Sequence, residues 1–260
     1  MNQSVGFTTG KAGMRSQNSN ALIEPLAKVL LGPLLLLQAR SVRRRMPRLP
    51  EPEGARSGQV GRGPMLRLLM AGDSAAAGVG AETQDAALAG RLVERLSEHL
   101  QVQWRLSART GLTTAQIAAR LAGAADGGFD VAVLSAGVND VTGRLDPGQW
   151  RVALEHLTGV LRDHGGVRHI VFAPLPPVHR FPALPQPLRW FLGTRAQAFN
   201  RQLATFVASQ TDCSLVALEF GFDRNWMARD GFHPGPSAYA LWAEAAAVDI
   251  LRWANAAGGV

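Results

Sequence analysis

The sequence predicts an α/β protein with a mostly parallel five-stranded sheet between two layers of helices. Short apolar runs of the length of buried strands alternate with longer segments whose apolar residues recur at helical spacing. Glycine and polar residues follow several of the apolar runs, as they do where a strand ends in a loop. Repeated strand–helix units favour parallel strands, because each helix returns the chain across a face of the sheet.

The individual elements follow from these patterns in chain order. The predicted strands are Met65–Ala71, Val102–Ala108, Phe129–Ser135, His169–Ala173 and Ser214–Leu218. The predicted helices are Ala86–Leu100, Thr113–Ala122, Pro147–His164, Thr194–Ser209 and Ser237–Asn255. Pro147 falls in a first helical turn, where its missing N–H costs no hydrogen bond. Thr113 or Thr114 can cap the helix that begins beside them.

Charge divides the chain into a basic N-terminal part and an electrically neutral remainder. The formal net charge of +7 lies entirely in residues 1–63, which hold ten Lys/Arg and three Asp/Glu. Residues 64–260 hold equal numbers of basic and acidic residues. Nucleic-acid binding by this neutral part is disfavoured, since such binding needs a broad basic face.

Composition further divides the chain into three parts. Residues 1–20 are polar and rich in Gly, Ser, Asn and Thr, which predicts disorder. Residues 21–63 form an arm that is first apolar, then rich in arginine, and finally a linker by composition. Residues 64–260 form the folded domain, which is long enough to bury a sizeable core.

The arm allows two interpretations, which the sequence leaves open. Its uncharged apolar core, Val29–Gln38, is too short to cross a bilayer as a helix. Five arginines between Arg40 and Arg48 follow it in place of a cleavage site, so a cleavable signal peptide is not supported. Residues 21–48 either lie on an anionic membrane surface or pack on the domain with their arginines in solvent. We expect a cytoplasmic protein, with membrane association as the open question.

Candidate active-site residues follow the predicted strands. The stretch Met65–Gly80 reads MLRLLMAGDSAAAGVG, in which a strand stops at glycine and then presents Ser74. Gly111 follows the second strand, Asn139 follows the third, and DGFHP (230–234) follows the last. If the strands are parallel, these residues meet at the edge where open α/β sheets bind ligands. Each feature alone is common in turns and helix caps, so only the whole set indicates an active site.

The set resembles the SGNH branch of the GDSL esterases and lipases. GDS, the isolated Gly111, GVND (137–140) and DGFH (230–233) occur in that family's order, over roughly Met65 to Trp253. The resemblance implies a flavodoxin-like three-layer α/β/α sandwich and a serine esterase that needs no cofactor. Ala75 stands where the motif's namesake has leucine, and the GxSxG elbow of α/β-hydrolases is absent.

The chemistry of ester hydrolysis explains these residue types. A serine hydroxyl attacks an ester carbonyl only when a base removes its proton, and His233 suits that role near neutral pH. Asp230 can hold the imidazole through its other nitrogen. The resemblance assigns the oxyanion donors to the backbone N–H groups of Ser74 and Gly111 and to the side-chain amide of Asn139.

A proline-rich and aromatic-rich segment, residues 174–193, follows the fourth predicted strand at the same edge. Prolines restrict its backbone, and it carries more apolar side chains than an exposed loop needs. We expect Phe181 and Trp190 to line a stiff acyl pocket that prefers short to medium acyl chains. The alternative is that these side chains only cover the sheet edge.

The predicted function is therefore hydrolysis of a small-molecule carboxylic ester through an acyl-enzyme on Ser74. Two alternatives remain: acyl transfer to an alcohol by the same residues, and a membrane-surface interaction protein whose hydrolase domain is inactive. No cofactor is expected. The single cysteine, Cys213, excludes a cysteine-rich metal site, and no His, Asp or Glu spacing predicts a metal.

Overall fold

The computed structural model describes residues 15–124, 127–143, 145–218 and 226–256. The chain divides into two compact units, Met1–Arg44 and Arg45–Val260. The described part of the first unit is the helix α1 (Arg15–Arg45). It begins inside the segment 1–20 that composition predicts to be disordered, since no proline or glycine interrupts residues 15–24. The rest of that prediction, residues 1–14, lies outside the described residues.

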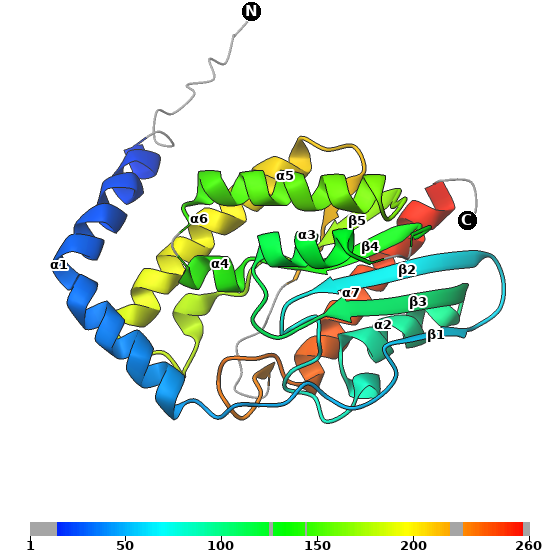
Figure 1. The fold of residues 1–260 in the computed structure, drawn as a ribbon, viewed down its shortest axis with the longest axis horizontal. Helices are drawn as coiled ribbons and strands as arrows, with labels where there is room; N and C mark the ends of the chain where they lie inside the picture. The colour runs from blue at the N-terminus through cyan, green and yellow to red at the C-terminus, as the bar shows by residue number, and fades with distance from the viewer. Residues whose placement is uncertain (1–14, 125–126, 144, 219–225, 257–260) are drawn as a thin grey trace, which may run out of the picture. The chain divides into compact units, whose positions relative to one another are not determined.

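The second unit is built on one six-stranded sheet (Figure 1). Its strands, in the spatial order β1-β3-β2-β4-β5-β6, are β1 (Ser57–Val60), β3 (Gln101–Ala108), β2 (Met65–Gly72), β4 (Val131–Ser135), β5 (His169–Phe172) and β6 (Cys213–Leu215). Strands β2 to β6 are all parallel to their neighbours, and β1 pairs with β3 in the antiparallel direction.

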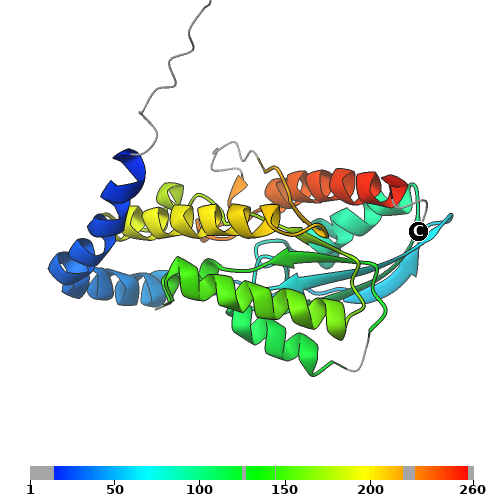
Figure 2. The ribbon, with the colours of Figure 1, turned by 90° about the horizontal axis from the view of Figure 1, so that it is seen from above.

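Helices cover both faces of this sheet. In Figure 2, α2 (Leu88–Ser97) and α7 (Pro236–Ala256) lie on one side of the sheet, and α3 (Thr114–Ala122) and α5 (Pro147–Asp163) lie on the other. The long helix α6 (Leu188–Ala208) packs through Phe206 on Phe172 of β5. Apolar side chains of α2 and α7 bury Leu66, Leu68 and Met70 of β2 completely. The predicted α/β/α sandwich with a mostly parallel sheet is thereby confirmed.

The sheet has six strands where five were predicted. The additional strand, β1, lies in the segment 49–63 that composition indicates to be a linker. All four of its residues are exposed and only Val60 is apolar, so no hydrophobic pattern reveals it. It exists because its backbone pairs with the edge of β3 and Gly58 lies against the Trp104 ring. Without β1, the strand order is the flavodoxin-like one, with the switch point at β2 and β4.

Two helices differ from the prediction in the region that matters for the site. A short helix, α4 (Val138–Thr142), follows β4 where only a loop was expected. Helix α6 begins at Leu188 and so takes up the end of the predicted proline-rich loop. Gly193 lets α6 pack closely on the 3₁₀ turn Val178–Arg180, since a Cβ there would lie 2.4 Å from the Cβ of His179. Within the described ranges, no helix is long and apolar enough to cross a membrane.

Candidate active site

Ser74 lies in a tight turn directly after β2. The strand must end in glycine, because a Cβ on Gly72 would lie 2.2 Å from the carbonyl oxygen of Ser135 on β4. The Asp73 N–H donates to that same carbonyl at 3.2 Å, and the Ala77 N–H donates to the Asp73 carbonyl at 2.9 Å. These contacts fix the turn on the sheet and leave the Ser74 side chain half-buried at its carboxyl edge.

Asp73, the acidic residue of the GDS sequence, is buried and braces this turn. Its Oδ1 accepts hydrogen bonds from the Ala75 N–H and the Ser135 hydroxyl, both at 3.1 Å. Burial raises the pKa of Asp73 to about 6, although the two hydrogen bonds partly offset the effect. Its position supports a bracing role, as residues within the turn and on β4 account for its hydrogen bonds.

The loop before α7 brings Asp230 and His233 together. Asp230 Oδ1 accepts from the backbone N–H groups of Phe232 and His233, each at 3.0 Å, and Oδ2 contacts His233 Nδ1 at 2.6 Å. Burial alone would raise the pKa of Asp230, but these hydrogen bonds outweigh burial and lower it. Asp230 is thus an anchored carboxylate that holds the imidazole in one orientation.

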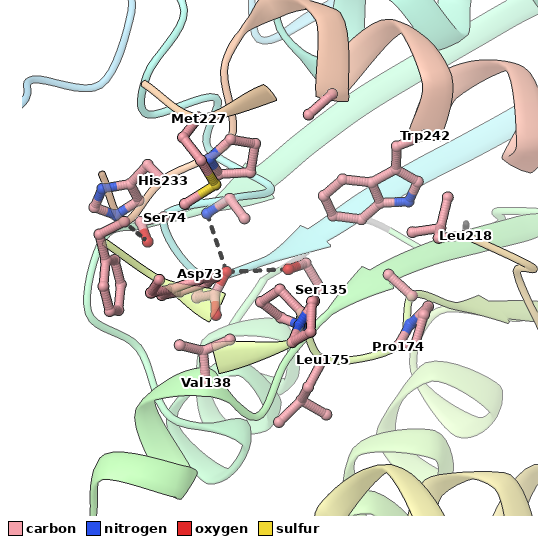
Figure 3. Close-up of a pocket in the computed structure, with 18 of the residues that line it drawn as sticks. Asp73, Ser74, Ser135, Val138, Pro174, Leu175, Leu218, Met227, His233 and Trp242 are labelled. Atoms are coloured by element: carbon pink, nitrogen blue, oxygen red, sulfur yellow. Dashed lines mark hydrogen bonds between the residues drawn. The ribbon is translucent and has the colours of Figure 1, made fainter. Parts of the chain in front are cut away.

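The other imidazole nitrogen faces the serine. His233 Nε2 lies 3.0 Å from Ser74 Oγ, across 159 positions of sequence (Figure 3). With the Nδ1 proton directed at Asp230, Nε2 carries the free lone pair that a serine proton needs. The structure therefore aligns Asp230, His233 and Ser74 in one hydrogen-bonded line, in the arrangement of a nucleophile, its base and the group that orients the base.

The two other predicted residues lie on neighbouring segments, one in the loop after β3 and the other in the short helix after β4. Gly111 follows β3 with φ +85°, a conformation that favours glycine, and nothing lies within 4 Å of the position where a Cβ would be. Asn139 lies on α4, and its amide Nδ2 donates to the Leu112 carbonyl at 2.9 Å. This bond joins the Asn139 side chain to the residue that directly follows Gly111.

A buried network around Asp140 joins helix α4, which carries Asn139, to the start of α3, which follows the Gly111 turn. Asp140 Oδ2 accepts from both the backbone N–H and the hydroxyl of Thr114, at 3.0 and 2.8 Å. Thr114 Oγ1 also accepts from Trp150 Nε1 at 2.8 Å. Burial raises the pKa of Asp140, while the Thr114 hydrogen bonds lower it in part. The partners lie 26 and 36 positions apart in the sequence, so no local pattern shows that these side chains meet.

An apolar cavity of about 80 Å³ opens beside Ser74 and His233. Figure 3 shows it extending from these two residues past Met227 and Leu175 toward Trp242 and Leu218. Phe181 lines this cavity and is only 3% exposed. Its ring packs edge-on against Phe232, the neighbour of His233.

Trp190 requires a correction. It does not line the cavity with Phe181, because it belongs to the first turn of α6 and is 41% exposed. Pro187 is the last proline of the segment and stands at the N-cap of α6, so the chain beyond it follows helical geometry. The rest of the cavity wall is formed by residues on α7 and in the segments after β5 and β6. These include Leu175, Leu218, Met227 and Trp242.

Within the described ranges, no group of three or more His, Cys, Asp or Glu side chains is arranged to hold a metal ion. Cys213 is a free cysteine, and burial raises the pKa of its thiol to about 12.

Comparison with known proteins agrees with this geometry. The family model described as GDSL-like lipase/acylhydrolase matches residues 70–241. The chain belongs to this GDSL-like lipase/acylhydrolase family. The predicted class, a carboxylic ester hydrolase of the SGNH or GDSL type, is confirmed by this membership. No curated protein matches the chain.

Solved structures share the fold of this GDSL-like domain. Est24, a carbohydrate acetylesterase from Sinorhizobium meliloti, is 14% identical with a TM-score of 0.56, over 72% of this chain and 99% of its own. TesA is 26% identical with a TM-score of 0.55, over 69% of this chain and 94% of its own. A family 3 carbohydrate esterase of Clostridium thermocellum is 20% identical with a TM-score of 0.54, over 72% and 98%.

Proposed function

We propose that this GDSL-family hydrolase works as a serine esterase with Ser74 as nucleophile, His233 as general base and Asp230 as the group that orients His233. The hydrogen-bonded line from Asp230 Oδ2 through the imidazole to Ser74 Oγ, with distances of 2.6 and 3.0 Å, supports these roles. A serine hydroxyl in contact with the unprotonated nitrogen of an anchored histidine is the arrangement that activates serine for attack on a carbonyl.

The reaction divides into two transfers of the acyl group. Ser74 Oγ attacks the ester carbonyl carbon while its proton passes to His233 Nε2, and the carbonyl oxygen becomes an oxyanion. His233 then gives this proton to the departing alcohol, which leaves an ester on Ser74. Water repeats the sequence: its proton moves to His233, its oxygen bonds to the acyl carbon, and the proton returns to Ser74 as the acid departs.

Three donors are proposed for the oxyanion: the backbone N–H groups of Ser74 and Gly111 and the amide of Asn139. Donors fixed in advance stabilise the charge that develops in the transition state, because they need no reorganisation. The Asn139 amide has two N–H bonds and uses one on Leu112, so its orientation is fixed while a second donor remains. The Asp140–Thr114 hydrogen bonds hold together the segments that carry the Gly111 and Asn139 donors.

The proposed substrate is a small ester with a short to medium acyl chain. The cavity beside Ser74 is small and almost wholly apolar, which suits a hydrocarbon chain. Buried side chains such as Phe181 and Leu175, 3% and 4% exposed, form its wall. A long lipid chain would need these side chains to move.

The test is a panel of p-nitrophenyl esters from acetyl to palmitoyl, assayed with the wild-type protein and with Ser74→Ala. We expect turnover to peak at short or medium chains and to fall by about 10⁴-fold or more in Ser74→Ala. A fluorophosphonate should label the wild type and not the variant. Turnover by Ser74→Ala near the wild-type rate would exclude Ser74 as the nucleophile.

The arm supports a second proposal, peripheral contact with an anionic membrane through residues 21–48. Exposed leucines of α1, at positions 30, 34, 36 and 37, precede arginines 40, 43, 44 and 45 in the same helix. Apolar side chains beside a cationic cluster match the interface of an anionic bilayer. The compact unit that contains the hydrolase fold begins at Arg45, before the boundary at residue 63 that composition indicates.

This proposal is tested on the full-length protein by vesicle co-sedimentation at low salt. The wild type should bind phosphatidylserine-containing vesicles, and a variant with arginines 40, 43, 44 and 45 changed to glutamine should bind them much less. Vesicles of phosphatidylcholine alone are the control. Equal binding of both proteins to anionic vesicles would show that the arginine cluster does not contribute to membrane binding.

A further inference from the structure

The segment 51–56, which composition indicates to be linker, lies against the loops of the candidate active site. The Gln84 N–H donates to the Glu53 carbonyl at 2.9 Å. The Gln84 side-chain amide donates to the carbonyl oxygens of Pro52, at 3.3 Å, and Ala77, at 3.0 Å. Ala77 belongs to the turn that carries Ser74. This segment is therefore held to the nucleophile loop through a buried glutamine.

The same segment contacts the Gly111 loop through Glu51. Glu51 Oε1 accepts from the Thr110 backbone N–H at 2.7 Å and from the Thr110 hydroxyl at 2.8 Å. The other carboxylate oxygen accepts from Arg56 at 3.1 Å, and the Arg56 guanidinium also donates to the Ala108 carbonyl at the end of β3. Glu51 thus links the end of β3 to the turn that follows it.

The Gly111 turn is held on its far side by the Asn139 amide at the Leu112 carbonyl, and on its near side by Glu51 at Thr110. Gly111 is exposed, and no atom lies within 4 Å of its Cβ position. Within the turn, the bond from the Leu112 N–H to the Arg109 carbonyl is long, at 3.4 Å. The short hydrogen bonds at Thr110, directly before Gly111, therefore contribute strongly to holding this loop.

We infer that Glu51 is a positioning residue that fixes the backbone N–H of Gly111 for the oxyanion. This inference rests on the proposed function, in which that N–H is one of three oxyanion donors. Glu51 does not touch the substrate; it acts through Thr110. It also lies outside residues 70–241, the part of the chain that matches the GDSL-like family.

The electrostatics of Glu51 agree with this role. Partial burial would raise the pKa of Glu51, but the Thr110 hydrogen bonds and Arg56 together lower it. Glu51 is thus ionised at neutral pH, where a carboxylate forms its strongest hydrogen bonds with an N–H.

A positioning role differs from a stabilising one in what it changes. Partly exposed ion pairs such as Glu51–Arg56 contribute little to the free energy of unfolding, so the loss of Glu51 should lower the melting temperature only slightly. A small displacement of a catalytic group, by contrast, has a large effect on rate. The expected signature is a reduced kcat at nearly unchanged KM and stability.

The experiment compares full-length Glu51→Ala, Glu51→Gln and Glu53→Ala on a short acyl ester. Glu51→Ala should lower kcat about tenfold, below the 10²–10³-fold cost of losing a whole oxyanion donor, with KM within about twofold. Glu51→Gln should recover most of the rate, because an amide oxygen can accept both Thr110 hydrogen bonds. Glu53→Ala is the matched control, since Glu53 is exposed and contacts Gln84 through its backbone.

An unchanged kcat in Glu51→Ala, or an equal loss in Glu53→Ala, would overturn the inference. Should Glu51→Ala fail to fold, Thr110→Val decides: it removes one of the two hydrogen bonds and should lower kcat about threefold, and an unchanged kcat refutes the role. The Ser74→Ala variant distinguishes a failure of the proposed function from a failure of the Glu51 role alone. If it retains turnover, the proposed function fails; if it is inactive while Glu51→Ala is normal, only this inference fails.

Discussion

Asp230→Asn should abolish catalysis while leaving the loop intact, because the two carboxylate oxygens of Asp230 do different work. Oδ1 accepts the backbone N–H groups of Phe232 and His233, and Oδ2 accepts the imidazole proton. An asparagine that places its oxygen at Oδ1 keeps both backbone hydrogen bonds. Its NH₂ group then faces His233 Nδ1, which must become an acceptor. The ring proton moves to Nε2, and Ser74 loses its base.

The expected loss follows from this change of tautomer. An asparagine in place of the orienting aspartate of a serine hydrolase triad costs about 10⁴-fold in kcat, which corresponds to about 5 kcal/mol of activation free energy. At neutral pH, Asp230→Asn should lose less stability than Asp230→Ala, because Asp230→Ala removes all three hydrogen bonds. The lowered pKa of Asp230 means that its charge stabilises the fold above its unfolded pKa, and that this contribution is lost as pH falls through the folded pKa.

The assay measures kcat and KM on p-nitrophenyl acetate beside thermal unfolding, for the wild type, Asp230→Asn and Asp230→Ala. Both variants should be inactive, and only Asp230→Ala should melt at a clearly lower temperature at pH 7. Turnover by Asp230→Asn within tenfold of the wild type would refute the assigned role of Oδ2.

Three further outcomes are expected. The pKa of Asp73 is raised to about 6 from 3.8, so its ionised form is unfavourable in the folded protein. Asp73→Asn should therefore increase the free energy of unfolding in urea above pH 6 by up to about 3 kcal/mol, and this gain should vanish near pH 4. A gain that persists at pH 4 would contradict this cause. Gly137→Ala should lower stability by about 1–3 kcal/mol in urea titrations and slow turnover, because its Cβ would meet the Trp150 ring at 2.7 Å at the start of α4; an unchanged midpoint would show that the ring moves freely. Phe181→Ala should shift the chain-length profile toward longer esters, whereas Trp190→Ala, outside the cavity, should keep it; identical profiles for Phe181→Ala and wild type would place the acyl pocket elsewhere.

The fold could be predicted where burial imposes a pattern. Strand β4 has five buried residues, and its apolar run stands out in the sequence. The edge strand β1 has four exposed residues and depends on backbone pairing with β3, which no local pattern records. Helix α4 could not be predicted for another reason. It has only five residues, and it starts at Gly137, whose φ of +113° is set by the tertiary fold.

The candidate site shows the same division. Ser74, Asp230 and His233 could be proposed together because each belongs to a short motif at a strand end, and the structure brings them into contact. Trp190 was placed wrongly, since a proline-rich composition does not show where a helix resumes. Glu51 could not be found at all, because its contact with Thr110 joins positions 59 residues apart. The preference for short to medium acyl chains stays a prediction.

The serine and histidine loops are also joined directly to each other. Gly80, six residues after Ser74, has φ +106°, and a Cβ there would lie 2.2 Å from the Pro234 carbonyl next to His233. The buried Tyr239 hydroxyl of α7 donates to the Val79 carbonyl at 2.7 Å. Ser74 and His233, the proposed nucleophile and base, are therefore also connected by contacts that do not pass through the sheet. If the sheet twists, these contacts would move the two loops together. The distance between Ser74 Oγ and His233 Nε2 would then change little.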